Sequence, residues 1–166
     1  MLSSAVKQLN ESLINDPKWD ELMTPNSRWR QDKVFSRYHQ LGNRQKGASG
    51  EYYTQRLMEI LGYEVTSPID SDHDRIIDGY KTEIKFSLAV SDSKKNAIVC
   101  DKFIINHAAA TKDWDRLIFI GVNPDPDWDN VQNKNNISFP KVRAYFMNKE
   151  DFVNHLEKHG TTVFKH

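Results

Sequence analysis

Three residues near the middle of the chain have the types and spacing of a metal-assisted hydrolytic site. Asp74 and Glu83 are carboxylates on either side of a turn signal, and Lys85 follows Glu83 with one residue between them. Carboxylate oxygens are ligands that Mg²⁺ prefers, and a neighbouring lysine can orient or help to deprotonate an attacking water. A bare Glu-x-Lys also describes a surface ion pair. The secondary structure that carries these residues therefore decides between a hydrolytic site and a surface ion pair.

The turn signal is Asp78-Gly79, which predicts a β-hairpin with strands over residues 74–77 and 81–88. Both residue types tolerate the positive φ of a two-residue type I′ turn. That turn places Asp74 opposite Glu83, with Lys85 on the same side of the sheet. Facing carboxylates repel each other unless a cation lies between them. We therefore expect a divalent cation at Asp74 and Glu83.

Other acidic residues compete for the same role. Asp78 is an alternative to Asp74, but a ligand inside the turn would point away from Glu83, so we assign Asp78 to the turn. Asp70 and Asp72 are interpreted as loop residues that would serve only if the register were shifted.

The net charge of zero is the sum of 23 basic and 23 acidic residues that are unevenly distributed. Residues 64–78 are mainly acidic, as a cation site requires. Residues 28–46 are mainly basic, with Asp32 as the one acid and aromatic residues interleaved, a pattern that fits either phosphate binding or a solvated helical face. The basic residues are Arg28, Arg30, Lys33, Arg37, Arg44 and Lys46.

Length and composition indicate one globular domain of 166 residues, 38% of them hydrophobic. Cys100 is the single cysteine, which excludes an internal disulfide and a cysteine-based zinc site. No apolar run is long enough to span a bilayer, and the first residues lack the apolar core of a signal peptide. We expect a cytoplasmic protein with no membrane function.

The hydrophobic pattern predicts an α/β (α+β) fold in which helices flank a mixed β-sheet. Residues 1–46 form a helical region for DNA binding or dimerisation, and residues 47–166 form the core. Helices are expected at 2–40 with breaks at prolines, at 49–61 with Ser49 as N-cap, at 101–111 and at 148–158. Strands are expected, besides the hairpin, at 63–66, 116–122, 142–147 and 161–164, with a polar loop at 123–136.

The segment from Asp74 to Lys85 resembles the active-site hairpin of the PD-(D/E)XK nuclease superfamily, best known from type II restriction endonucleases. Family members commonly place a glutamate on the helix before the first core strand, where this chain has Gly50-Glu51. Residues 101–122 resemble the helix and core strand that follow. The resemblance covers residues 47–122, and His73 stands where the family name has proline.

The resemblance implies a restriction-endonuclease-like core and a role for each matching residue. Asp74 and Glu83 would bind Mg²⁺, for which Mn²⁺ can substitute, with the main-chain carbonyl of Ile84 as a further ligand. Lys85 would orient or activate the water. Glu51 would hold a second metal or a metal-bound water, unless it only complements the helix dipole.

The function implied is a Mg²⁺-dependent endonuclease that hydrolyses phosphodiester bonds of double-stranded DNA, most simply a sequence-specific type II restriction enzyme acting as a homodimer. The six basic residues, Ser87, Asn106 and His107 are the expected DNA contacts. One alternative is a repair, recombination or junction-resolving nuclease of the same fold. The other is a non-catalytic DNA-binding module.

Overall fold

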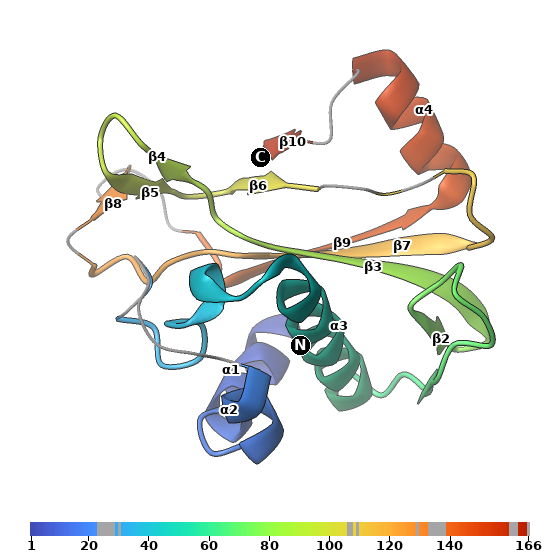
Figure 1. The fold of residues 1–166 in the computed structure, drawn as a ribbon, viewed down its shortest axis with the longest axis horizontal. Coiled ribbons are helices and arrows are strands. Elements are labelled where there is room, and N and C mark those ends of the chain that lie inside the picture. Colours follow the sequence, from blue (N-terminus) through green and yellow to red (C-terminus); the bar gives the residue numbers. More distant parts are fainter. Residues whose placement is uncertain are drawn as a thin grey trace.

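A computed structural model describes residues 1–22, 29, 31–105, 108, 110–128, 130–132, 139–159 and 163–165. Its centre is a five-stranded mixed sheet with the order β1-β2-β3-β7-β9 (Figure 1). β3 and β7 run parallel, and the other neighbours run antiparallel. The strands are β1 (Val65–Thr66), β2 (Arg75–Ile77), β3 (Tyr80–Leu88), β7 (Arg116–Val122) and β9 (Val142–Asn148).

Helices flank this sheet, as the sequence predicts. One face carries α1 (Leu2–Leu13), α2 (Pro17–Leu22) and α3 (Asn43–Ile60), and a 3-10 turn (Tyr38–Gln40) precedes α3 (Figure 1). The other face carries α4 (Lys149–His159) and the antiparallel pair β6 (Lys102–Ile104) and β10 (Val163–Lys165). A small separate sheet contains β4 (Ser91–Asp92), β5 (Ala97–Val99) and β8 (Val131–Gln132). Within the described part of the chain, no helix has the length and apolar character needed to cross a membrane.

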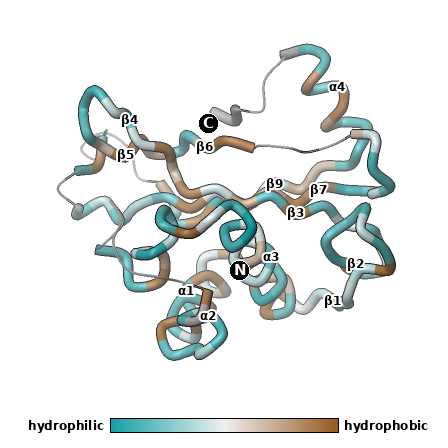
Figure 2. Tube along the Cα trace, in the orientation of Figure 1, coloured by the Kyte–Doolittle hydropathy of each residue, from teal (hydrophilic) through white to brown (hydrophobic). Residues whose placement is uncertain are grey.

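One part of the core lies between the central sheet and α3. Figure 2 shows hydrophobic stretches along β3, β7 and β9. The side of α3 that faces the sheet buries Tyr53, Leu57 and Met58. The helix approaches β3 closely at Gly50, where an added Cβ would lie 2.5 Å from the Cβ of Phe86. A glycine is therefore required for α3 to pack at this distance.

The predicted hairpin is confirmed with its two-residue turn. Ile77 pairs with Tyr80, and the register continues to Arg75 and Thr82. Asp78 and Gly79 have φ values of 49° and 80°, as a type I′ turn requires. The carboxylate of Asp78 accepts a hydrogen bond from the main-chain amide of Glu64 at 2.8 Å. Asp78 is therefore a turn residue.

The prediction that Ser49 begins a helix is wrong. α3 begins at Asn43, and the Gln45 side chain accepts a hydrogen bond from the Gly42 amide at 3.2 Å at this end. Ser49 is buried inside the helix, where its hydroxyl donates to the carbonyl of Lys46 at 3.0 Å. Because α3 crosses the expected boundary between residues 46 and 47 and packs against α1 and α2, the two regions are parts of one structure.

The helix expected over residues 101–111 is absent from the residues that the structure describes there. Asp101 has a left-handed backbone, with φ of 55°, and β6 follows it. The Phe103 ring is fully buried and packs edge-on against Phe119, with ring centroids 5.9 Å apart. Packing onto the sheet and pairing with β10 therefore override the local helical preference. The predicted helical region extended to residue 40, but residues 33–37 form turns and a 3-10 turn follows them, so this part of the prediction is wrong.

Candidate active site

Asp74 lies at the edge of β3, one residue before β2 begins. Its main-chain amide donates to the carbonyl of Thr82 at 3.0 Å. Its carboxylate oxygen Oδ2 accepts a hydrogen bond from the amide of Ile84 at 2.7 Å. The strand pairing therefore ends at Arg75, and Asp74 does not face Glu83 as the cross-strand partner that the sequence predicted.

This arrangement leaves part of β3 without a strand on its β2 side. β2 pairs with β3 only as far as Thr82, whereas β3 continues to Leu88. The amide of Ile84 points to the open edge, because it donates to Asp74. In a strand, the N–H and C=O of one residue point to the same side, so the Ile84 carbonyl also lies on this edge. A carboxylate and a main-chain carbonyl therefore meet where the sheet is open.

Glu83 and Lys85 form a close pair on the face of β3 that points away from α3. Lys85 Nζ lies 2.5 Å from Glu83 Oε1, and only 5% of the Glu83 side chain is exposed. Burial raises the pKa of Glu83, and the negative charge of Asp74 acts in the same direction, while the hydrogen bond from Lys85 lowers it. Burial therefore favours the neutral form of Glu83, whereas the positive charge of Lys85 favours its ionised form.

Glu51 reaches the same site from α3. Burial raises its pKa, as does the negative charge of Asp74, against the positive charges of Arg75 and Lys85. Arg75 connects the helix with the hairpin: Nη1 lies 3.4 Å from Glu51 Oε2 and 2.5 Å from the Asp74 carbonyl, and Nε donates to Gln55 at 2.9 Å. No sequence motif marked Arg75, because its role depends on the packing of two separate elements.

These residues line a pocket of about 310 Å³ at the open edge of β3. Asp74, Ile84, Lys85 and Glu51 contribute to its surface, whereas Arg75 and Glu83 are not lining residues and Glu83 reaches the pocket only through its contact with Lys85. A larger pocket of about 470 Å³, between α1 and β9, contains none of the predicted site residues. The lining residues are Tyr38, Asn43, Lys46, Gly47, Glu51, Asp74, Ile84, Lys85, Phe86, Ile104 and Ile105.

The donors at this edge fit a hard divalent cation. Asp74 and Ile84 offer oxygen atoms beside an open pocket. Burial raises the pKa of Glu51 and of Glu83, the charge of Asp74 acts in the same direction, and a bound cation would favour the ionised form of both groups. Mg²⁺ commonly takes one or two carboxylates and keeps several waters. Across the residues that the structure describes, no three His, Cys, Asp or Glu side chains form a ready-made metal cluster.

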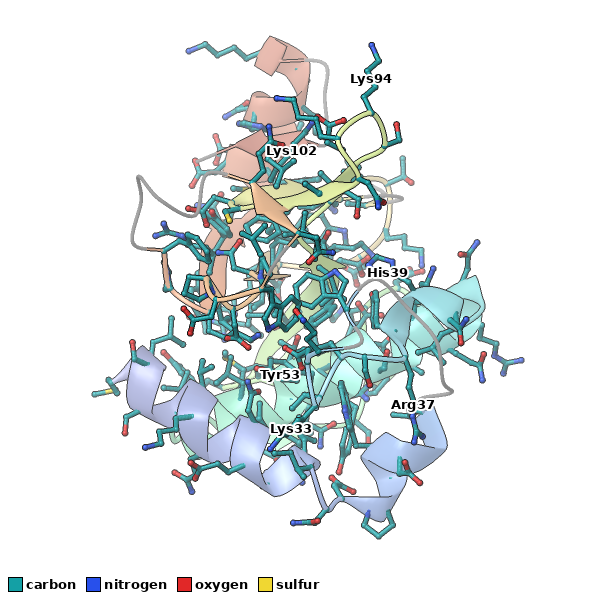
Figure 3. The ribbon with its side chains drawn as sticks, turned by 90° about the vertical axis from the view of Figure 1, so that its left-hand side faces the viewer. Lys33, Arg37, His39, Tyr53, Lys94 and Lys102 are labelled. Atoms are coloured by element: carbon teal, nitrogen blue, oxygen red, sulfur yellow. The ribbon has the colours of Figure 1, made fainter. Side chains whose placement is uncertain are left out.

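The expected DNA contacts are dispersed. Lys46 lines the pocket, and Arg44 is exposed on the first turn of α3. Arg37 pairs with Asp20 of α2 at 2.8 Å, and Lys33 lines a different pocket beside α1; both lie near the N-terminal helices in Figure 3.

The remaining expected DNA contacts lie elsewhere. The hydroxyl of Ser87 donates to the Leu88 carbonyl at 2.8 Å and accepts from the Ile104 amide at 3.3 Å, and Ser87 does not line the pocket. Arg28, Arg30, Asn106 and His107 lie outside the described residues.

Comparison with known proteins adds no family to this description. The chain matches no protein-family model, no curated protein and no solved structure. The geometry of the site therefore indicates its chemistry. Its carboxylates and a main-chain carbonyl can bind a cation, and the neighbouring amine can hold a water or an anionic oxygen.

Proposed function

We propose that this protein is a metal-dependent endonuclease that hydrolyses phosphodiester bonds of DNA and has a restriction-endonuclease-like core. One observation carries the proposal: Asp74, Ile84, Lys85 and Glu51 line a single pocket at the open edge of β3, with Glu83 in contact with Lys85. Cation ligands, a candidate water-orienting amine and room for a phosphate group therefore occur together.

The residues of the pocket have distinct proposed roles. Asp74, Glu83 and the Ile84 carbonyl would hold Mg²⁺, with Glu51 as a supporting ligand. The bound ion would lower the pKa of its water and neutralise charge on the phosphate. Lys85 would hold the attacking water in line with the phosphorus atom and would donate a hydrogen bond to a phosphate oxygen. Arg75 would position Glu51 and the Asp74 main chain.

The order of the elements supports the family resemblance. The helix with Glu51 is α3, the first strand is β1, the hairpin is β2–β3, and β7 lies beside β3 as the following core strand. β6 occurs where the resemblance implied a helix. This departure lies in the connection between β3 and β7, and Ile104 of β6 lines the same pocket as Asp74 and Lys85.

Incubation with mixed plasmid and genomic DNA tests the proposal. Wild-type protein is expected to cut in Mg²⁺ or Mn²⁺ and not in EDTA, and the fragment ends are then sequenced. Ends with a common sequence support a restriction enzyme. Such an enzyme would act as a homodimer, because cutting both strands of a symmetric site calls for two active centres. Unrelated or junction-dependent ends support a repair or recombination nuclease. Binding without cutting in every metal would overturn the proposed activity and leave a DNA-binding module.

A further inference from the structure

One part of the pocket lining has no role in the chemistry proposed above. Tyr38 is only 7% exposed, and its ring packs against Phe86 with centroids 5.6 Å apart. Its main-chain amide and carbonyl are held in the 3-10 turn by Phe35 and Leu41. The aromatic ring is therefore fixed in position, and Tyr38 lines the pocket that also contains Asp74 and Lys85.

The hydroxyl of Tyr38 has no hydrogen-bond partner among the residues that the structure describes. The comparable tyrosines of α3 differ in this respect. Tyr52 donates to Asp16 and Tyr53 donates to Asn10, each at 2.8 Å. Figure 3 shows Tyr53 between α3 and the N-terminal helices. The Tyr38 hydroxyl is also not one of the fully buried unpaired atoms of the described structure, so it is accessible, and Tyr38 lines the pocket. Another molecule in the pocket can therefore accept its hydrogen bond.

The surroundings of this hydroxyl favour an anion. Asn43 and Lys46, from the first turns of α3, line the same pocket. Within the described structure Lys46 has no acidic partner, and the amino end of a helix carries positive partial charge. Burial raises the pKa of Tyr38 above its ordinary value, so the hydroxyl remains a donor at neutral pH. Three donors and a helix end therefore line the same pocket as the acidic residues.

We propose that Tyr38, together with Asn43 and Lys46, binds a backbone phosphate of the DNA strand that is cut at the neighbouring Asp74–Lys85 site. Tyr38 is then a substrate-binding residue that holds the strand in position, whereas Asp74, Glu83 and Lys85 act on the scissile group. This inference rests on the proposed nuclease function, because it names the partner of the same pocket.

Binding in EDTA tests the inference without requiring cleavage. The probe is a fluorescein-labelled 20-base-pair duplex followed by anisotropy. Tyr38→Phe, which removes only the hydroxyl, is expected to weaken binding about tenfold, as the loss of a hydrogen bond to a charged group predicts. Lys46→Gln is expected to weaken binding and to reduce the dependence of log K on log salt by about 0.9, the value for one phosphate contact. Tyr38→Phe should leave this salt dependence unchanged, because tyrosine is neutral.

Tyr53→Phe is the matched control, since it removes a buried hydroxyl outside the pocket. It is expected to bind the duplex like wild type and to lower the free energy of unfolding, because Asn10 loses its donor. Tyr38→Phe is expected to unfold like wild type. If Tyr38→Phe binds DNA as tightly as wild type, the inference is overturned.

Cleavage kinetics separate this inference from the proposed function. In an active enzyme, Tyr38→Phe should raise KM by a larger factor than it lowers kcat. Weaker binding by Tyr38→Phe in a protein that never cuts DNA would support the phosphate site and overturn the nuclease. If the protein cuts DNA and Tyr38→Phe has an unchanged KM, the nuclease is supported and the phosphate site is overturned. A wild-type protein that binds neither duplex nor single-stranded DNA would overturn both.

Discussion

At the scale of single residues, the contact between Glu83 and Lys85 combines burial with charge. The carboxylate is 5% exposed and lies 2.5 Å from the amine, which is itself 20% exposed. A buried carboxylate usually needs a cation to remain ionised, and here a lysine supplies part of that charge. The two residues therefore depend on each other, and each is expected to respond to changes at the other.

The first prediction concerns Glu83 and pH. Burial raises the pKa of Glu83 in the folded protein above its ordinary value. The stability that Glu83 contributes is then fully present below the unfolded-state pKa and is lost as pH rises through the folded-state pKa. In EDTA, the free energy of unfolding of wild type should therefore fall relative to that of Glu83→Gln as the pH rises above about 4, the unfolded-state pKa of a glutamate. Urea denaturation at several pH values measures this difference, and a flat difference would contradict the prediction.

The second prediction concerns Lys85. Lys85→Ala should lower the cleavage rate by about a hundredfold or more, because a positioned general acid–base group contributes on this scale, while DNA affinity is largely retained. Single-turnover cleavage and duplex binding measure the two effects separately. Lys81→Ala is the control on the same strand, since Lys81 pairs with Asp113 outside the pocket. Undiminished cutting by Lys85→Ala would remove the amine from the mechanism.

The third prediction concerns the metal. Mn²⁺ or Mg²⁺ should raise the Tm of wild type, because a ligand at a hundred times its Kd stabilises the folded state by about 2.7 kcal/mol. Asp74→Asn should lose most of this gain while keeping an oxygen that can accept from the Ile84 amide. Asp127→Asn, which changes an exposed carboxylate away from the pocket, should respond like wild type. An equal metal response in all three proteins would indicate nonspecific binding.

At the scale of elements, the hairpin could be predicted and the helix over residues 101–111 could not. Asp78-Gly79 fixes the turn through local backbone preference, so the register and the shared face of Glu83 and Lys85 follow from the sequence. Phe103, by contrast, lies in a strand because its ring packs on Phe119, a contact between distant segments. Asp74 shows both effects. Its position at the start of the hairpin was predictable, but the contact of its carboxylate with the Ile84 amide depends on where the strand pairing stops.

The fourth prediction compares two glycines of α3. An added Cβ at Gly47 would meet no atom within 4 Å, whereas one at Gly50 would lie 2.5 Å from the Phe86 Cβ. Gly47→Ala should stabilise the protein by about 0.5–1 kcal/mol, the difference in helix propensity. Gly50→Ala should destabilise it by about 1–3 kcal/mol through overpacking. Urea denaturation measures both values, and equal effects would show that α3 does not approach β3 as closely as described.

At the scale of the whole molecule, the basic residues that the structure describes between residues 31 and 46 do not gather on one surface. Lys46 lines the candidate site, while Lys33 and Arg37 lie beside α1 and α2. Asp32, the one acid of the segment, is 4% exposed and accepts hydrogen bonds from the amides of Val34 and Phe35, each at 2.8 Å. The sequence shows where these charges lie along the chain, whereas the fold places Lys46 in the pocket and Asp32 in the buried interior.

Asp32 also binds Lys141, and this pair joins the N-terminal region to the sheet. Lys141 Nζ lies 2.5 Å from Asp32 and 3.3 Å from Asp125, and it is 5.7 Å and 5.3 Å from the ring centroids of Trp29 and Trp128. Lys141 directly precedes β9, whereas Asp32 lies between α2 and α3. The charge pair therefore connects segments that are distant in the sequence.

The fifth prediction is that this connection supports the stability of the whole fold. Lys141→Met leaves the buried carboxylate of Asp32 without its cation and should lower the free energy of unfolding by on the order of 2 kcal/mol. Asp32→Asn keeps an oxygen for the amides of Val34 and Phe35 and removes the charge. If the pair acts as a unit, the double variant should be less destabilised than the sum of the single variants, by about 0.5–3 kcal/mol in urea denaturation. Strictly additive losses would mean that Asp32 and Lys141 stabilise their own segments independently, so that packing of Trp29 and Trp128 would hold the N-terminal region to the sheet.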